Sequence, residues 1–310
     1  MGVRPRRLDT QHSRAIEPSR RGRDARSTVL ELPFRRPYPW QEMLVYFRDR
    51  AVTGVEIVDD AYTRTVHVGN RVGTVHIEID PSRDAVCAEG LALKDADART
   101  IETQLRDLLD LDAVPADIAA QLRRDPLLEP LVAAYPGLRV PGCWDVFETV
   151  VRAVVGQQVS VKAARTVLGR LVAEYGEPVD DPTGEPMRLF PTPEKLADRD
   201  LMHVGLNRGR AEALAGAARR FADDPQFVRR GMPSAEALDR MLGIRGIGPW
   251  TANYVLLRGL RDHDAFPAAD LGALKASGAR NARALEARAE HWRPWRGYAL
   301  LYLWKSLSTI

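Results

Sequence analysis

A glycine-rich stretch between two helix-forming segments constrains this chain more than any other feature of its sequence. Residues 242–252 read Leu-Gly-Ile-Arg-Gly-Ile-Gly-Pro-Trp-Thr-Ala. Ser234–Leu242 has apolar residues at helical spacing, and the glycines that follow allow backbone angles that residues with a Cβ avoid. Pro249 has the fixed φ and the missing N–H that suit the first position of a helix. The sequence therefore predicts two helices, Ser234–Leu242 and Pro249 to about Gly259, joined by a tight hairpin.

A hairpin of this kind can bind phosphate. Exposed amide groups around Gly246 and Gly248, at the start of the second helix, form a positive concavity that accepts a phosphate oxygen without reading the base sequence. Thr251 follows in the first turn of that helix and is a further candidate for DNA contact. We expect these residues to hold the DNA backbone and not the bases.

The hairpin resembles the helix-hairpin-helix element of the base-excision DNA glycosylase superfamily. Asp270 follows 22 residues after Gly248, within Phe-Pro-Ala-Ala-Asp-Leu-Gly, where that superfamily has its catalytic aspartate. Three further segments resemble the bacterial alkylpurine glycosylases, the 3-methyladenine DNA glycosylase II family: Pro136–Cys143 (Pro-Gly-Leu-Arg-Val-Pro-Gly-Cys), Gly156–Val161 (Gly-Gln-Gln-Val-Ser-Val) and Trp292–Leu301 (Trp-Arg-Pro-Trp-Arg-Gly-Tyr-Ala-Leu-Leu). The likeness covers residues 28–304.

The hydrophobic pattern predicts an α+β chain. Alternating apolar residues predict strands at 30–34, 55–58, 63–68 and 72–79, and apolar spacing predicts a helix over 40–50. Beyond Ile101 the pattern is helical, with a capping box at Asp145 and Glu148 and a helix over 161–175 that Gly176 ends. The resemblance implies an N-terminal antiparallel sheet domain similar to half of TATA-binding protein, followed by the mostly helical helix-hairpin-helix glycosylase fold.

We therefore expect four regions. Residues 1–27 are predicted to be a disordered basic arm, residues 28–117 the sheet domain, and residues 146–262 the helical domain with the hairpin. Residues 118–145 and 263–310 together form a second helical lobe that carries Asp270. The arm is either a DNA-scanning tail or a solvated extension without function.

Charge and cysteine content narrow the functional classes. The chain has a net charge of +3, but residues 1–26 carry eight arginines against three acidic residues, which leaves −2 on the rest. Any DNA-binding surface of the folded part must therefore be local. Cys87 and Cys143 are too few for a four-cysteine iron–sulfur cluster and are expected to be free thiols in a reducing cytosol. No apolar run is long enough to span a membrane.

Asp270 is the candidate catalytic residue. An N-glycosidic bond breaks through a cationic, oxocarbenium-like sugar, so a carboxylate beside the anomeric carbon stabilises the developing charge and orients the attacking water. An alkylated purine already carries positive charge and can leave without a strong general acid. The alternative is that Asp270 only caps a helix beginning at Leu271, and the two roles can coexist.

Trp250 occupies the position at which lyase relatives have a nucleophilic lysine. Because an indole cannot form an imine, the resemblance implies a monofunctional glycosylase that leaves the abasic strand intact. Trp250 and Tyr254 lie four residues apart and share a helix face, where the resemblance joins them with Trp295 and Tyr46 in a base pocket. These rings stack on a cationic base by cation–π attraction, or they are core residues. Leu271 completes the pocket at a position where a tyrosine can occur.

The remaining candidates concern DNA distortion and ions. In the family a side chain from the Gly-Gln-x-Val-Ser loop fills the gap left by the flipped base; the matching residue here is Gln158, while Gln157 is structural or faces phosphate. The resemblance also implies a monovalent cation held by the main-chain carbonyls of Leu242, Ile244 and Ile247. No cofactor is required.

The sequence thus predicts a hydrolase that removes alkylated purines from double-stranded DNA, working as a cytoplasmic, nucleoid-associated monomer. Two alternatives remain: a helix-hairpin-helix DNA-binding protein that has lost catalysis, and a glycosylase for deaminated or oxidised bases. The carboxylate of Asp270 distinguishes an enzyme from the non-catalytic DNA-binding protein. The tryptophan in place of a lysine at position 250, and too few cysteines for a cluster, argue against most glycosylases that act on deaminated or oxidised bases.

Overall fold

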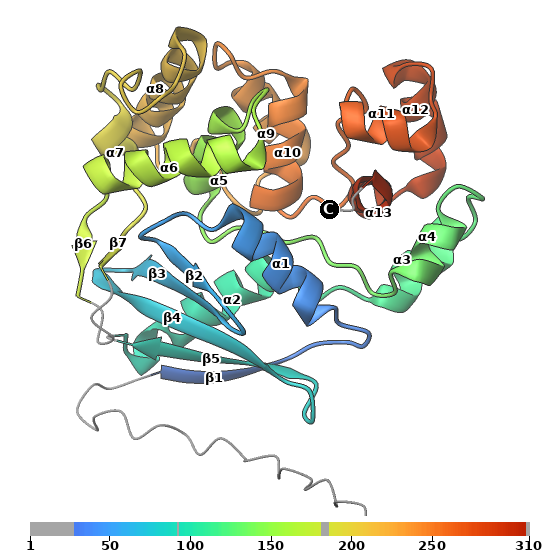
Figure 1. Cartoon of the computed structure of the whole chain (residues 1–310), viewed down its shortest axis with the longest axis horizontal. Helices are drawn as coiled ribbons and strands as arrows, with labels where there is room; N and C mark the ends of the chain where they lie inside the picture. Colours follow the sequence, from blue (N-terminus) through green and yellow to red (C-terminus); the bar gives the residue numbers. More distant parts are fainter. Residues whose placement is uncertain (1–27, 92, 181–185, 308–310) are drawn as a thin grey trace, which may run out of the picture.

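The computed structural model describes residues 28–91, 93–180 and 186–307. These residues form an antiparallel sheet and two helical lobes, which meet around the helix α1 (Trp40–Arg50) (Figure 1). The α+β class expected from the sequence is confirmed. The predicted disordered arm, residues 1–27, lies outside the described residues.

The sheet has five antiparallel strands in the order β1-β5-β4-β3-β2. They are β1 (Thr28–Pro33), β2 (Glu56–Val58), β3 (Tyr62–Val68), β4 (Arg71–Asp80) and β5 (Ala85–Leu91). The four predicted strands are present, and β5 is an addition that the hydrophobic pattern did not identify. Its sequence, Ala-Val-Cys-Ala-Glu-Gly-Leu, is rich in small residues and therefore lacks clear apolar and polar alternation.

Two helices cover the sheet, α1 and α2 (Ala98–Leu109). The ring of Phe47 in α1 stacks on that of Tyr62 in β3, with 4.6 Å between the ring centroids. From α1 the core receives residues at helical spacing, Trp40, Met43, Leu44 and Phe47. From α2 it receives Ile101, Leu105, Leu108 and Leu109. This core places α1 between the sheet and the helical lobes.

The middle lobe carries the predicted hairpin. It consists of α5 (Val146–Val155), α6 (Val161–Tyr175), α7 (Pro193–Leu196), α8 (Arg208–Asp223), α9 (Ser234–Leu242) and α10 (Pro249–Gly259). The predicted bounds of α6, α9 and α10 are confirmed, and the Asp145 side chain caps α5 by accepting the Glu148 amide. The proline-rich connection contains a short hairpin, β6 (Pro178–Val179) and β7 (Met187–Arg188).

The second lobe combines two distant parts of the chain. It contains α3 (Pro115–Leu122), α4 (Glu129–Ala134), α11 (Leu271–Ser277), α12 (Ala282–Ala289) and α13 (Arg296–Leu307). Asp125 joins the two parts, because its carboxylate accepts hydrogen bonds from Arg288 and from Trp292 Nε1 at 2.7 Å. The predicted boundary between residues 117 and 118 is wrong, since it falls inside α3, which begins at Pro115.

Four charged residues, two of them buried and two partly buried, fix the sheet against the middle lobe. Arg64 in β3 donates to Glu148 in α5 at 2.7 Å. Arg152, one turn later in α5, donates to Glu148 at 2.6 Å and to Glu56 in β2 at 2.7 Å. Burial opposes ionisation of Glu148, but the two guanidinium groups outweigh it and hold the pKa of this carboxyl below its usual value. We call these four residues the interdomain network.

Candidate active site

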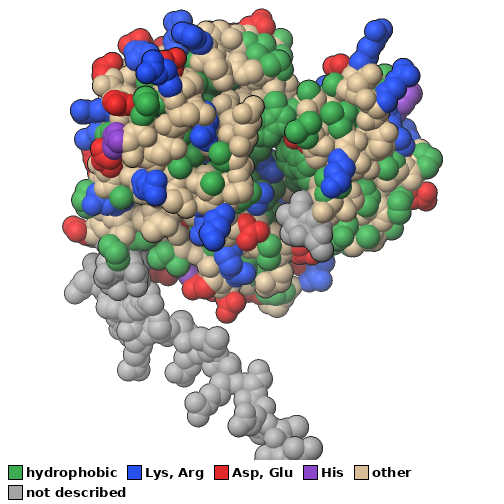
Figure 2. Space-filling view, turned by 45° about the horizontal axis from the view of Figure 1, so that its top comes forward, with side chains coloured by type: hydrophobic (Ala, Val, Ile, Leu, Met, Phe, Trp, Pro, Cys, Tyr) green, Lys and Arg blue, Asp and Glu red, His purple; other side chains and the backbone are tan. Residues whose placement is uncertain are grey.

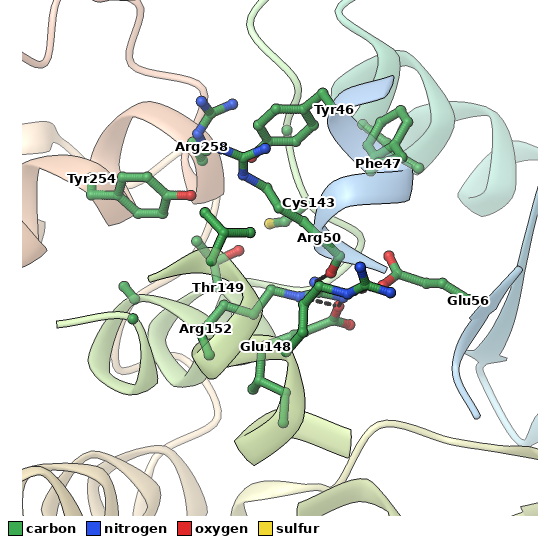
Figure 3. A pocket seen from close by; sticks show the side chains of 18 of the residues that line it. Tyr46, Phe47, Arg50, Glu56, Cys143, Glu148, Thr149, Arg152, Tyr254 and Arg258 are labelled. Atoms are coloured by element: carbon green, nitrogen blue, oxygen red, sulfur yellow. Dashed lines mark hydrogen bonds and ion pairs between the residues drawn. The ribbon is translucent and has the colours of Figure 1, made fainter. Parts of the chain in front are cut away.

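A cavity of about 360 Å³ lies where the three units meet. Figure 2 shows that this face of the molecule is hollowed between the two helical lobes. The wall includes side chains of α1, α5, α10 and α13 together with the interdomain network, seen from close by in Figure 3. Its volume lies within the range of pockets that enclose small organic ligands.

Asp270 lies in the wall of this cavity and is 8% exposed. Its Oδ1 accepts the Ala273 amide at 2.7 Å, so that Asp270 caps α11. The same oxygen accepts Trp304 Nε1 at 2.8 Å, and Oδ2 accepts Trp250 Nε1 at 2.7 Å. Asp270 therefore caps a helix and faces the cavity at the same time, as the sequence allowed.

The three donors to Asp270 are all uncharged. Among residues 28–91, 93–180 and 186–307, no arginine, lysine or histidine lies within ion-pair distance of this carboxylate. Its position is fixed by hydrogen bonds while its negative charge remains uncompensated. Such a group can stabilise positive charge that develops beside it.

Trp304 in α13 is a site residue that the sequence analysis missed. Its indole N–H holds the Asp270 carboxylate, and its ring lines the cavity. The residue ends a run of apolar side chains in α13, Tyr-Ala-Leu-Leu-Tyr-Leu-Trp, so the pattern indicates only a buried helix. No local signal separates Trp304 from its core neighbours.

Three of the predicted pocket rings are brought together. Trp250 and Tyr254 stack in α10 with 5.4 Å between ring centroids and 19° between ring planes. The hydroxyl groups of Tyr46 in α1 and Tyr254 are close enough to influence each other's ionisation. Burial raises the pKa of Tyr46 to about 12, whereas the nearby Arg258 guanidinium, working against burial, lowers the pKa of Tyr254.

The other two predicted pocket residues do not line this cavity. Trp295 packs instead on Tyr298 and His263, with ring centroids 5.7 and 6.1 Å away. It lies just before α13, at the end of that helix away from Trp304, and its ring neighbours Tyr298 and His263 both contact the buried Asp110 carboxylate. Leu271 is 82% exposed, because as the first residue of α11 it points outward while Asp270 points inward. The predictions that Trp295 and Leu271 line the base pocket are therefore wrong.

One of the glycines in the hairpin between α9 and α10 is required by the backbone geometry. Gly246 has a φ of +89°, and a Cβ there would lie 2.7 Å from the Cβ of Ala213. Gly248 has an extended backbone with a φ of −96°, and a Cβ there would meet open space. Gly246 is therefore required by the fold, whereas the open side of Gly248 leaves its surroundings accessible to a phosphate.

Gln157 connects the loop after α5 to the hairpin. Its Nε2 donates to the Gly246 carbonyl at 3.1 Å and to Thr251 Oγ1 at 3.0 Å. This geometry favours the structural alternative for Gln157. Thr251 as a whole is 3% exposed and its hydroxyl accepts from Gln157, so the predicted DNA contact of Thr251 is wrong in this conformation.

Gln158 differs sharply from its neighbour Gln157. Its side chain is exposed, and its φ of +55° lies in the left-handed region that residues with a Cβ adopt rarely. It lies in the short connection between α5 and α6, followed by Val159 and Val161, which are partly exposed at the cavity. The backbone thus presents Gln158 outward, beside the entrance to the site.

Two arginines of the cavity were also missed. Arg258 in α10 is 4% exposed, donates to the Pro141 carbonyl at 2.7 Å and lies 4.7 Å from the centroid of the Tyr46 ring. Arg50, at the end of α1, lies 4.3 Å from the same centroid. Arginines at the ends of helices usually face solvent, so sequence spacing alone did not place them here.

The carbonyls predicted to bind a cation lie at the end of α9 and in the hairpin. The Ile244 carbonyl accepts the Ile247 amide at 3.0 Å. The part of the chain that the structure describes has no group of three acidic, histidine or cysteine side chains arranged to bind a metal. Cys87 and Cys143 are free thiols, Cys143 being buried. None of the described helices is both long and apolar enough to cross a membrane.

Two family models match the chain. The model of the AlkA N-terminal domain matches residues 29–145, and the model of the HhH-GPD superfamily base excision DNA repair protein matches residues 151–290. Their boundary lies at the start of α5, where the sheet domain meets the middle lobe.

Individual relatives cover most of the chain. DNA-3-methyladenine glycosylase 2 of Escherichia coli is 35% identical over 86% of this chain and 94% of its own length. A protein of Mycobacterium tuberculosis named a probable bifunctional transcriptional activator/DNA repair enzyme AlkA is 40% identical over 92% of this chain. The chain spans only 58% of the length of that relative.

Solved structures share the fold. A 3-methyladenine DNA-glycosylase from Archaeoglobus fulgidus superposes with a TM-score of 0.78, covering 89% of this chain and 97% of its own, at 22% sequence identity. A structure described as MBOgg1 in complex with a low affinity DNA ligand gives a TM-score of 0.69, covering 90% of this chain and 94% of its own, at 21% identity.

Proposed function

Because the chain belongs to the helix-hairpin-helix superfamily of base excision DNA repair proteins, we propose that it hydrolyses the N-glycosidic bond of alkylated purines flipped out of duplex DNA. The observation that carries this proposal is the Asp270 carboxylate, fixed by three uncharged donors in the wall of a cavity. The names of the relatives support the class of substrate.

The reaction needs only water as a co-reactant. The bond between the sugar C1′ and the purine nitrogen breaks, and its electron pair leaves with the base. The oxygen of water then forms the new bond to C1′ and loses a proton. Asp270 would stabilise the cationic sugar between these events and orient the water, while the stacked rings of Trp250 and Tyr254 would hold the departing base.

Trp250 also supports hydrolysis without strand cleavage. Its indole cannot form a Schiff base, and its N–H is committed to Asp270. The product would be an intact strand with an abasic site. Appearance of cleaved strand in the absence of alkali would contradict this part of the proposal.

DNA would be held at two places on the same side of the cavity. The amides near Gly248 at the start of α10 would bind a phosphate, and Gln158 would enter the gap that the flipped base leaves. We propose that the protein acts as a monomer on double-stranded DNA carrying alkylated bases, in association with the nucleoid in the cytoplasm.

The proposed monovalent cation remains compatible with the residues present. The carbonyls of Leu242 and Ile244 lie at the C-terminal end of α9, the negative end of its dipole, which favours a cation. The carbonyl of Ile247 would complete the set from the hairpin. When bound, the ion would add positive charge near the phosphate site.

The test is base release from duplexes that each contain one damaged base, compared for the wild type and for Asp270→Asn. Release of alkylated purines by the wild type only would support the proposal. DNA binding without release from any duplex would instead support a non-catalytic DNA-binding protein. Release confined to deaminated or oxidised bases would favour the other alternative from the sequence analysis.

A further inference from the structure

Two arginines in the wall of the cavity share one aromatic ring, that of Tyr46. The guanidinium carbons of Arg50 and Arg258 lie 4.3 and 4.7 Å from the centroid of Tyr46. The side chains of Tyr46, Arg50, Tyr254 and Arg258 converge on this region (Figure 3). Two positive groups are thus held close together in a largely enclosed space.

Neither arginine has a carboxylate partner within the described parts of the chain. By contrast, Arg64 and Arg152, which line the same cavity, are paired within the interdomain network. The Nε of Arg258 is also buried without a hydrogen-bond partner. The buried Arg258 is held by the neutral Pro141 carbonyl and by the faces of the Tyr46, Tyr254 and Trp304 rings. Because buried cations are normally paired with an anion, this region can receive an acceptor from outside the chain.

Helix α10 determines how the arginines are placed relative to the rings that would hold the base. Trp250, Tyr254 and Arg258 follow at four-residue intervals and lie along one face of α10. Eight residues of helix correspond to about 12 Å between the backbones of Trp250 and Arg258. The Arg258 guanidinium reaches to 5.8 Å from the centroid of the Trp304 ring, whose N–H donates to Asp270. An adduct arm on a base seated at the rings of Trp250 and Tyr254 would therefore lie within reach of Arg258, whose guanidinium is 5.4 Å from the centroid of the Tyr254 ring.

We propose that this pair of arginines binds an anionic adduct arm on the damaged base, which makes carboxyalkylated purines substrates of the enzyme. The inference rests on the proposed function. A purine with a carboxymethyl group on a ring nitrogen has a positive ring and a negative arm. The ring would stack on Trp250 and Tyr254, and the carboxylate would accept hydrogen bonds from Arg50 and Arg258. The bond that breaks is the same, and water remains the only co-reactant.

The test compares two adducts of similar length in the same sequence, 7-carboxymethylguanine and 7-ethylguanine, each in duplex DNA with 7-methylguanine as a reference. Single-turnover release is measured at saturating enzyme. We expect the wild type to release the carboxymethyl adduct at least as fast as the ethyl adduct. Arg258→Met and Arg50→Met, which keep apolar volume and remove the charge, should each lower the ratio of carboxymethyl to ethyl release at least tenfold.

Two further variants serve as controls. Arg258→Lys keeps a positive charge and should retain part of the ratio. Arg124→Met removes an exposed arginine away from the cavity and should leave the ratio unchanged. Thermal unfolding of each variant is measured first. Arg50 is less buried than Arg258, so Arg50→Met decides the question if Arg258→Met fails to fold.

The outcomes distinguish this inference from the proposed function. No release of 7-methylguanine would contradict the proposed function itself. Release of the methyl and ethyl adducts with tenfold slower release of the carboxymethyl adduct would overturn the inference alone. A wild-type ratio that persists in both methionine variants would also overturn it, because the arm would then be accepted without the arginines.

Discussion

Asp110 and Asp270 are both buried carboxylates with several hydrogen bonds, and the charge of their donors separates them. Asp110, the residue after α2, accepts the Tyr298 hydroxyl at 2.6 Å and the Val140 amide at 2.8 Å. It is also paired with the Arg261 guanidinium. Burial alone would raise the pKa of this carboxyl, but Arg261 and the hydrogen bonds hold it well below its usual value.

Asp270 has two indole N–H donors and one backbone amide, with no cation among them. The field of Asp110 is cancelled by its arginine, whereas the field of Asp270 is available to a positive sugar. Burial and the number of hydrogen bonds therefore do not distinguish the proposed catalytic carboxylate from a structural one. Uncharged donors hold a carboxylate in place and leave its charge free to act.

The comparison is tested most strongly by Asp270→Asn. The change removes the charge that opposes the oxocarbenium ion and nearly conserves shape, so single-turnover base release should fall by about 10³-fold or more. DNA affinity, measured by equilibrium binding, should change little. Release at the wild-type rate would remove Asp270 from the mechanism.

Asp110→Asn should have the opposite effect: it should lower stability and leave base release nearly unchanged. It leaves Arg261 buried without its counter-ion, which we expect to lower the free energy of unfolding by about 3 kcal/mol, since asparagine retains one acceptor. Urea unfolding measures this loss. At a temperature where the variant is folded, base release should stay near the wild-type rate, and a large loss of release would mean that Asp110 supports the chemistry.

Trp304→Phe removes one donor to Asp270 and keeps an aromatic ring in the cavity. A hydrogen bond to a charged group contributes about 1.5–3 kcal/mol, so base release should fall about tenfold or more as the carboxylate loses its fixed position. Trp295→Phe is the matched control, because Trp295 packs on two of the residues that contact Asp110. It should alter the melting temperature and not the rate, and equal losses of rate would contradict this assignment.

The smallest expected effect concerns pH. A carboxyl whose pKa is lowered in the folded state contributes stability above its unfolded pKa, near 3.8, and loses it as the pH falls toward the folded value. The stability gap between the wild type and Asp110→Asn should therefore narrow below pH 3.8, by up to about 1.4 kcal/mol per pH unit. Unfolding curves at pH 7 and pH 3 would show it, and a constant gap would contradict the lowered pKa.

Local signals explain what the sequence could predict. Glycine and proline act on the backbone at their own positions, so the bounds of α9 and α10 followed from Gly243 and Pro249. The position of Asp270 followed from its spacing to the hairpin.

The site residues that the sequence did not predict depend on contacts between helices that are far apart in the chain. Trp295 precedes α13 and Trp304 lies near its end, and the packing of α13 against α11 decides which of them reaches Asp270. The same holds for Arg258, whose site is completed by Tyr46 from α1, more than 200 residues earlier. Such contacts leave no periodic pattern.

The interdomain network also bears on how a chain of this kind can be inherited or rearranged. Arg64 and Glu148 lie on opposite sides of the junction near residue 145 that separates the two matched regions. A recombination event at that junction would have to bring a matching partner with each half. Otherwise the sheet half would retain the buried Arg64 without the carboxylate it is bonded to, at a cost of about 3–5 kcal/mol, whereas Glu148 would keep Arg152 from its own half. The two halves are therefore expected to evolve together, and chimeras should tolerate exchange only when both residues are transferred.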